Sequence, residues 1–361
     1  MLCHFANFHG EVTNKIRDPE KIGSQASLRL QIIPSLVALN KIGYQDAAYS
    51  LHYSDQKSLS MLDGSLACLI GKLSANNTNE MQKLALANLN AIRYLKQQNI
   101  KIILMYCDNH IFRSNIPLLS QLYKELFAAS DYIIYPTQTL KTLTEKHIPK
   151  NAKTFIIKDP WQIREERPYQ EKENNEPWKI IWFGSNKSVQ YLCKILPGLL
   201  KSKKLADKYE LTILGSEFSL THIQSFIPLE KNIFDHWTLR LATWNSDNQP
   251  EQLETELNRS HISIIPTDHA DPLNQGTSHN RIVDSIRSGC LPIASPLPSY
   301  QELAKISILG NDFENLLFLT TFEYKRLINK HNLYRSEYLN TFSPQANFDS
   351  WTNFWHSALN N

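Results

Sequence analysis

The stretch HNRIVDSIRSGCLPIASPLPSYQEL, from His279 to Leu303, places a helix, a turn and a strand in direct succession. Ile282, Val283 and Ile286 recur at helical spacing, so these three side chains lie on one face toward a core. Gly289 follows as the residue that ends the helix, and the apolar run LPIAS comes next as a strand. A helix that leads directly into a strand is the repeating unit of a parallel sheet joined by crossover helices.

The same alternation of short apolar runs and helix-period segments extends along the whole chain. It predicts an α/β protein with two doubly wound parallel sheets. Helical segments are expected at Ala26–Asn40 and Asn115–Ala128, which carry apolar stripes. The expected strands are Leu2–Ala6, Ala47–Leu51, Leu66–Ile70, Lys101–Tyr106, Tyr132–Tyr135 and Thr154–Ile157 in the first half, and Lys179–Phe183, Glu210–Leu214, Leu239–Trp244, Ile262–Pro266, Leu291–Ser295 and Ile306–Leu309 in the second.

A charged segment without apolar periodicity, Ile163–Trp178, divides the two halves and is predicted to be a linker. The expected domains are therefore residues 1–162 and 179–340, with the linker at 163–178. The remaining residues, 341–361, carry Phe348, Trp351 and Trp355 on one helical face. This face either caps its own domain or crosses back to the first domain, and we expect the second arrangement.

Composition limits the class of protein. The 361 residues are 42% hydrophobic and 20% charged, with a formal net charge of +3, which excludes a disordered or coiled-coil chain and disfavours nucleic acid as a partner. The cysteines, Cys3, Cys68, Cys107, Cys193 and Cys290, have no CxxC spacing, so neither a zinc site nor a disulfide framework is expected. We expect a cytoplasmic protein without a metal, a signal peptide or a transmembrane segment, and contact with the inner face of a membrane stays open.

The carboxyl ends of strands are where ligands bind in doubly wound sheets, and the chain is polar at these junctions. After the strand ending at Phe183, Gly184 lets the backbone approach a ligand and Lys187 is suited to a phosphate. Ser185 or Asn186 is suited to capping the next helix. An ordinary capped turn with an exposed lysine is the alternative. At the second polar junction, which follows the strand Leu239–Trp244, Trp244 is suited to stacking on a base and Asn245 to hydrogen-bonding it. A tryptophan at a strand end is, however, often simply packed.

The segment from Pro266 to Arg281 is the most specific of these junctions. Asn280 and Arg281 fall in the first turn of the predicted helix, where a cation opposes the helix dipole. An anion bound at that helix end explains Arg281, and an exposed arginine without function is the alternative. In the first half, Asp108 and His110 follow a strand, where they either act in a cleft between the domains or satisfy local backbone groups.

The segment His279–Leu303 resembles the donor-domain signature of GT-B glycosyltransferases, in particular the broad retaining, family 4-like group. Three further segments are similar to this group in chain order: IIWFGSNKS after the linker, ELNRSHISIIP before Thr267, and ASDYIIYPTQTL in the first half. The resemblance implies a GT-B-like fold, with two Rossmann-like domains facing a cleft. It further implies an acceptor-side first domain and a second domain that binds a nucleotide-sugar donor.

The resemblance also implies roles for individual residues. One departure stands out, because the group usually carries an acidic residue where this chain has Gly276. Asp268 and Asp271 are nearby substitutes, and a polar turn over DHADP is the alternative. The implied set is Gly184, Ser185, Lys187, Asn280 and Arg281 for the donor diphosphate, Trp244, Asn245 and Asp284 for the nucleoside, Asp268, Asp271, Gly276 and Thr277 for the donor sugar, His110 and Asp108 for catalysis, and Arg29 on the acceptor side.

The expected function is transfer of a sugar from a nucleotide diphosphate sugar to a carbohydrate or other acceptor, with no cofactor besides this co-substrate. Retention of configuration and metal independence are expected, in the setting of polysaccharide biosynthesis. Two other functions fit the same fold: a sugar-nucleotide epimerase or hydrolase, and a non-catalytic subunit that binds a nucleotide or a glycan. A periplasmic-type solute-binding protein is disfavoured, because the chain has unpaired cysteines and no export signal order.

Overall fold

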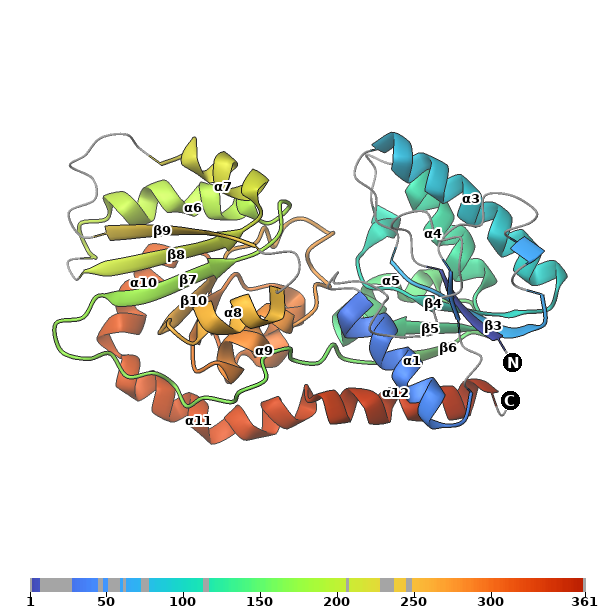
Figure 1. The fold of residues 1–361 in the computed structure, drawn as a ribbon. Helices are drawn as coiled ribbons and strands as arrows, with labels where there is room; N and C mark the ends of the chain where they lie inside the picture. The colour runs from blue at the N-terminus through green and yellow to red at the C-terminus, as the bar shows by residue number, and fades with distance from the viewer. Residues whose placement is uncertain are drawn as a thin grey trace. The chain divides into compact units, whose positions relative to one another are not determined.

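A computed structural model of the chain describes residues 2–6, 28–44, 48–50, 59–60, 63–72, 78–112, 117–205, 208–227, 237–244 and 249–359. The chain divides into two compact units, drawn in Figure 1. Unit 1 comprises Met1–Pro160, Asp271–Ser278 and Pro344–Asn361, and unit 2 comprises Trp161–Ala270 and His279–Ser343. Each unit is built on a parallel sheet.

The sheet of unit 1 has the strand order β2-β1-β3-β4-β5-β6, and all of its described pairs are parallel. The register pairs Ile70 at the end of β3 with Leu104 near the end of β4, so both strands finish at the same edge. The strands are β1 (Leu2–Ala6), β2 (Ala48–Ser50), β3 (Ser65–Ile70), β4 (Lys101–Met105), β5 (Tyr132–Tyr135) and β6 (Lys153–Ile156).

Apolar side chains of these strands alternate between two cores, one on each face of the sheet. Ile102 and Leu104 face one core, and Ile103 and Met105 face the other. The first expected helix starts later than predicted, as α1 at Ile33, after a π-helical turn over Leu28–Ile32. The helices are α1 (Ile33–Lys41), α3 (Thr78–Gln97), α4 (Pro117–Ala129), α5 (Gln138–Thr144) and α12 (Pro344–Leu359), with 3-10 turns at His110–Phe112 and Glu145–His147.

The C-terminal helix α12 packs on α1, as the aromatic spacing predicts (Figure 1). Trp351 and Trp355 are completely buried in the core on the α1 side of the sheet, and Phe348 packs at its margin. The Trp355 indole N–H donates to the carbonyl oxygen of Ser35 in α1 at 3.1 Å. Residues of α12 therefore complete a core of the unit that also contains β1.

The sheet of unit 2 has the order β12-β11-β10-β7-β8-β9 and is also parallel. Within this sheet, the first strand in sequence is β7. β8 and β9 follow on one side of it, and β10 lies on the other side. The strand order therefore reverses between β7 and β10, which is the place where doubly wound sheets bind ligands. The strands are β7 (Trp178–Phe183), β8 (Tyr209–Gly215), β9 (Trp237–Thr243), β10 (Ile262–Ile265), β11 (Leu291–Ala294) and β12 (Ile308–Leu309).

Helices cover both faces of this sheet as well (Figure 1). Ile180 and Trp182 of β7 belong to the larger core, whereas Ile181 and Phe183 point to a smaller one beneath α8. The helices are α6 (Val189–Lys201), α7 (Glu217–Gln224), α8 (Gln249–Leu257), α9 (Asn280–Arg287), α10 (Phe313–Phe322) and α11 (Tyr324–Thr341), with a 3-10 turn at Pro298–Leu303.

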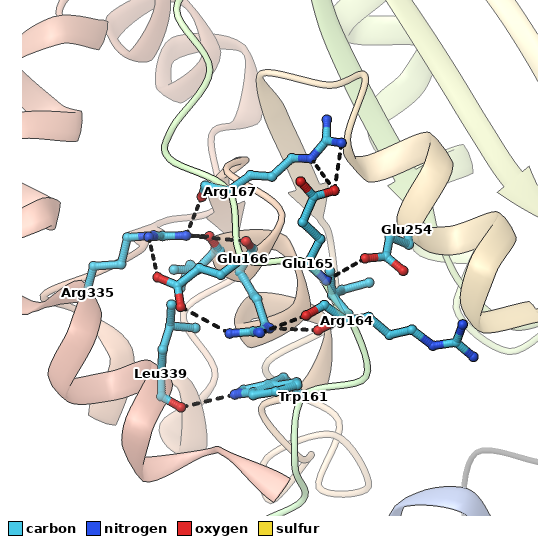
Figure 2. A network of polar contacts seen from close by, with 11 residues as sticks. Trp161, Arg164, Glu165, Glu166, Arg167, Glu254, Arg335 and Leu339 are labelled. Carbon is cyan, nitrogen blue, oxygen red and sulfur yellow. Dashed lines mark hydrogen bonds and ion pairs between the residues drawn. The ribbon is translucent and has the colours of Figure 1, made fainter.

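The segment predicted to be a linker, residues 163–178, belongs to unit 2 and is fastened to it by polar contacts (Figure 2). The Glu166 carboxylate forms ion pairs with Arg335 of α11 at 2.8 Å and with Arg287 of α9 at 3.1 Å. The Trp161 indole donates to the carbonyl of Leu339 at 3.1 Å. The charges that suggest an exposed linker therefore pair with this unit, and we name residues 161–170 the strap.

The strap also contacts Gly289, which follows Ser288, the C-cap residue of α9. Gly289 has a positive φ of +81°, and a Cβ built on it would lie 2.1 Å from the carbonyl oxygen of Pro168. The amide of Gln170 donates to the carbonyl of Gly289 at 3.1 Å. A glycine is therefore required here both by the left-handed backbone and by the passage of the strap.

Candidate functional site

The carboxyl end of β7 in unit 2 leads into a tight turn, in which Gly184 leaves no room for a side chain. A Cβ on Gly184 would lie 2.4 Å from Ser188 Oγ and 3.0 Å from the ring of the completely buried Trp182. The Ser188 hydroxyl closes the turn by donating to the carbonyl of Ser185 at 2.9 Å. Ser185 and Lys187 are exposed on this turn. The turn thus presents backbone and a lysine at the strand-order reversal, as predicted for a diphosphate.

Asn186, in the same turn, connects β7 to the start of α7. Its side-chain carbonyl accepts from the hydroxyls of Ser216 and Ser219, the latter at 2.8 Å. Ser216 is the N-cap of α7 and accepts from the Ser219 amide at 3.1 Å. These bonds fix the turn after β7 against the carboxyl end of β8. Figure 1 shows α6 and α7 on the same face of this sheet.

Arg281 lies in the first turn of α9, at the carboxyl end of β10. Its Nη2 donates to Thr267 Oγ1 at 3.4 Å, and its Nη1 is buried without a hydrogen-bond partner among the described residues. Thr267 is itself held by its amide, which donates to Ser295 Oγ at 2.9 Å. A buried cationic nitrogen without a partner at a helix N-terminus is electrostatically suited to an anion. Asn280 starts the same helix and is half-buried.

A cavity of about 200 Å³ opens beside Thr267, between α6 and the ends of β10 and β11. Lys194 of α6 lies 3.7 Å from the Asp268 carboxylate at its wall, and the amide of Ala270 donates to Asp268 at 3.0 Å. Pockets for whole ligands of drug size are usually ~300–1,000 Å³. This cavity is therefore large enough for one part of a ligand.

Trp244, the predicted base-stacking residue, is half-buried at the end of β9. Its indole donates to the carbonyl of Gly184 at 3.4 Å, and its ring packs at the margin of the core beneath α8. The residue thus lies beside the turn after β7, with part of its ring exposed. Asn245, predicted to accompany it, lies outside the described residues.

Asp284, predicted to bind the nucleoside, is 1% exposed on α9. One carboxylate oxygen accepts from the Gln162 amide at 2.7 Å, and the other accepts from the Gln162 side chain at 3.1 Å. These contacts fasten the start of the strap to α9. Both carboxylate oxygens therefore have hydrogen-bond partners within unit 2.

In unit 1, the predicted catalytic pair lies together after β4. The His110 Nε2 atom is 3.7 Å from the Asp108 carboxylate, and the imidazole stacks on the ring of Tyr123 at 4.8 Å between centroids. His110 is 3% exposed, whereas Asp108 is about one-third exposed. Lys72, which follows β3, forms an ion pair with Asp108. The pair is thus held in place by a cation that the sequence prediction did not include.

The residues predicted to bind the donor sugar are divided between the units. Asp268 belongs to unit 2, whereas Asp271, Gly276 and Thr277 lie in the segment Asp271–Ser278 of unit 1. Thr137 donates to the Gly276 carbonyl at 3.2 Å. The remaining contacts of this segment include Asn109 donating to Pro272, Asp271 accepting from the Leu273 amide, and Thr277 donating to Asn274.

Close packing against Leu140 explains why position 276 is a glycine, where the resembled group has an acidic residue. A Cβ at this position would lie 2.7 Å from the side chain of Leu140. Arg29, predicted on the acceptor side, is half-buried in the π-helical turn before α1. Gln31, in the same turn, belongs to a buried hydrogen-bonded group with Cys107 and Asp159.

Several residues of these sites escaped the sequence prediction. Lys72 follows Gly71 directly after a predicted strand, which is the same signal that singled out Lys187. Ser295 closes the predicted strand LPIAS and was detectable as a polar strand end. Asn109 and Lys194 carry no such signal, because their partners are set by tertiary packing.

Among the residues that the structure describes, no group of three or more His, Cys, Asp or Glu side chains is arranged to hold a metal ion. No helix in the same part of the chain has the length and apolar character needed to cross a membrane.

Comparison with solved structures gives matches over the whole chain. The apo form of the lipopolysaccharide outer core galactosyltransferase WaaB is 12% identical, with a TM-score of 0.64 over 99% of this chain and 100% of that one. HepE of Anabaena in complex with UDP and glucose is 10% identical, with a TM-score of 0.64 over 99% and 100%. Sucrose-phosphate synthase from Thermosynechococcus elongatus is 11% identical, with a TM-score of 0.62 over 98% of each chain.

In sequence, no family model and no curated protein matches the chain. The structural matches and the two doubly wound parallel sheets together establish the GT-B fold that the motif resemblance predicts. At this level of identity the matches define the fold, and the chemistry has to be argued from the site.

Proposed function

We propose that the chain is a glycosyltransferase that transfers a sugar from a nucleotide diphosphate sugar to a carbohydrate or other acceptor. The observation that carries the proposal is Arg281, whose buried Nη1 atom lacks a partner at the N-terminus of α9. Lys187 is exposed on the turn after the neighbouring strand β7. Two cations and a helix N-terminus at the strand-order reversal suit a diphosphate.

The same groups would serve catalysis as well as binding. As the bond between the sugar and the diphosphate breaks, negative charge grows on the leaving group, and fixed cations stabilise it. We propose that Lys187 and Arg281 supply this stabilisation without a metal ion, and that Gly184, Ser185 and Asn280 supply backbone and side-chain donors. Unchanged turnover in the presence of a chelator is the expected result.

Roles in sugar transfer are proposed for residues of both units. His110 and Asp108, with Lys72 beside them, would contact the donor sugar or the acceptor hydroxyl. The donor sugar set consists of Asp268, Asp271, Gly276 and Thr277, and Arg29 stays a proposed acceptor-side residue. Retention of configuration is part of the proposal through the motif resemblance, and the anomeric configuration of the product measures it.

The nucleoside part of the proposal rests on Trp244, whose ring is partly exposed beside the turn after β7. UDP is the first nucleotide to test, because the HepE structure contains UDP and has this fold. Participation in polysaccharide biosynthesis and a cytoplasmic setting complete the proposal.

The first test is calorimetric binding of UDP, GDP, CMP, ADP and dTDP. We expect selective binding of one nucleotide, and Arg281→Ala should weaken it by about 1–3 kcal/mol, the scale of a charge-assisted contact. Arg259→Ala is the control, because Arg259 is exposed and follows α8 rather than the site. Equal affinity in wild type and Arg281→Ala would remove Arg281 from the donor site.

Turnover separates this proposal from the alternatives. A transferase releases nucleotide and extends an acceptor, an epimerase changes the sugar without an acceptor, and a hydrolase needs water alone. Binding without turnover across donors and acceptors would favour a non-catalytic subunit, which the glycine at position 276 makes worth testing.

A further inference from the structure

Unit 2 exposes a group of apolar side chains at the end of α10. Phe322 is 80% exposed, Leu319 49% and Phe318 40%. The rings of Phe318 and Phe322 are stacked, with centroids 6.4 Å apart. Buried Phe313, Leu317 and Thr320 hold the opposite face of the helix on the core. Three large apolar groups thus project together from a helix that is anchored on the core, and a contiguous apolar patch indicates an interaction surface more strongly than single exposed residues do.

Basic side chains surround this apolar group. Lys325 and Arg326 start α11 directly after it, with side chains 83% and 72% exposed. Lys330 is exposed one helical turn beyond Arg326. Lys172 lies 5.5 Å above the ring of Trp178 and completes the rim. We name Phe318, Leu319, Phe322, Lys172, Lys325, Arg326 and Lys330 the basic apolar face.

The acidic groups at this face are neutralised within it. Glu323 is paired with Arg326, and Glu171 lies 3.9 Å from Lys325. Among the residues named as the face and their ion-pair partners, four basic side chains stand against two acidic ones, which is an excess of positive charge. The apolar tip of the face is therefore surrounded by an excess of cationic groups, which is the composition of a surface that lies on anionic lipid.

A cavity of about 500 Å³ opens within the face, lined by Lys172, Trp178, Phe322, Tyr324 and Arg326 among others. Trp178 is the first residue of β7, so the cavity lies at the amino edge of the sheet. The candidate nucleotide site lies at the opposite, carboxyl edge. A surface bound here would leave the turns of that site uncovered.

We propose that the basic apolar face docks unit 2 on an anionic lipid bilayer. Phe318, Leu319 and Phe322 enter the boundary between headgroups and acyl chains, while Lys325, Arg326 and Lys330 contact lipid phosphates. A second copy of the chain suits the face less well. Three apolar side chains are few for a stable dimer, which uses about 20–30 residues a side, and a two-fold contact would bring the excess cations together.

The test is sedimentation of the full chain with vesicles, and it needs no nucleotide or acceptor. We expect binding to phosphatidylcholine vesicles that contain phosphatidylglycerol and much weaker binding to phosphatidylcholine alone. Raising the salt from about 0.15 M to 1 M shortens the Debye length from ~8 to ~3 Å and should weaken the binding. Because no substrate is involved, the result does not depend on the proposed function.

Substitutions with matched controls locate the contact. Phe322→Ser should lower the partition coefficient roughly tenfold, and the double variant Lys325→Gln/Arg326→Gln roughly twenty-five-fold, at about fivefold for each charge. Phe218→Ser is the apolar control, since Phe218 is 64% exposed on α7. Lys150→Gln/Lys153→Gln is the charge control, with both residues exposed in unit 1. Neither control should change binding.

Three results would overturn the proposal. These are an absence of binding to anionic vesicles, equal binding to neutral and anionic vesicles, and an equal loss in the Phe218→Ser control. Sedimentation velocity without vesicles tests the alternative, in which a second copy of the chain occupies the face. A dimer that Phe322→Ser dissociates, in a protein that ignores vesicles, would assign the face to a second copy instead.

Discussion

A single carboxylate on α9 shows how one residue can have a structural partner where a ligand was expected. Asp284 accepts two hydrogen bonds from Gln162 and is almost fully buried. The burial of a charged group is tolerated because both oxygens are satisfied. The position in the helix is the one expected from the motif, but its side chain faces the strap.

We therefore predict that Asp284→Asn lowers stability and leaves nucleotide affinity unchanged. The amide can accept from the Gln162 backbone but places an NH₂ group where the Gln162 side chain donates, at a cost of about 1–3 kcal/mol. Chemical denaturation and calorimetry measure the two effects. Asp349→Asn, at an exposed site, is the control and should cost less than ~0.5 kcal/mol. A loss of nucleotide affinity would restore Asp284 to the nucleoside site.

At the scale of elements, α12 contributes to a core made from residues far away in sequence. Trp351, Phe354 and Trp355 are completely buried against α1 and the sheet. We expect α12 to depend on this burial, because most helical stability in proteins comes from packing of the apolar face.

Trp355→Ala should destabilise unit 1 by about 3–5 kcal/mol, the range for removing a large buried aromatic side chain. The variant also leaves the Ser35 carbonyl without the indole donor. Urea denaturation followed by circular dichroism measures the loss. The control His356→Ala changes the neighbouring, exposed residue of the same helix. Similar losses for the two variants would show that α12 is not anchored through Trp355.

Elements that bury apolar side chains were predictable from sequence, and elements held by backbone groups were not. Apolar runs such as KIIWF and LPIAS predict strands, because alternate residues of a buried strand fill the cores on its two faces. The strap has no such pattern. It is held by Arg287 and Arg335, which donate to the carbonyls of Ile163, Arg164 and Arg167, and a carbonyl is the same in every residue.

The candidate site divides in the same way. Lys187 and Arg281 were found from their places beside a strand and a helix start. The assignment of Asp271–Ser278 to unit 1 was not predictable, because it depends on hydrogen bonds from Asn109 and Thr137.

At the scale of the whole molecule, two buried histidines make stability depend on pH. Burial lowers the pKa of His261 to about 4, assisted by the charge of Lys179. Its Nδ1 atom accepts from the Lys179 amide at 3.0 Å, which requires a neutral ring. Burial likewise lowers the pKa of His331 to about 4, with Lys330 as the second cause. Both rings are therefore neutral in the folded protein at pH values where the unfolded chain is protonated.

We predict that the free energy of unfolding falls as the pH drops from about 6.5 toward 4. The unfolded chain binds a proton at each histidine near pH 6.5 and the folded chain does not, so each contributes about 2 kcal/mol of loss by pH 5. Above pH 6.5 this contribution is constant. Urea midpoints at pH 7 and pH 5 measure it, and the double variant His261→Asn/His331→Gln should flatten the difference. An unaltered difference in that variant, as expected for exposed His356→Gln, would contradict the prediction.

The return of α12 to unit 1 has a consequence for the order of synthesis. Domains usually fold as they leave the ribosome, with the N-terminal one first. Here the core on the α1 side contains Trp351 and Trp355, which are translated only after all the residues of unit 2. A nascent chain of 160 residues would leave Leu36 and Leu39 without these partners, whereas unit 2 ends at Ser343 and can fold first. Of the two units, the one whose synthesis starts earlier is therefore completed later.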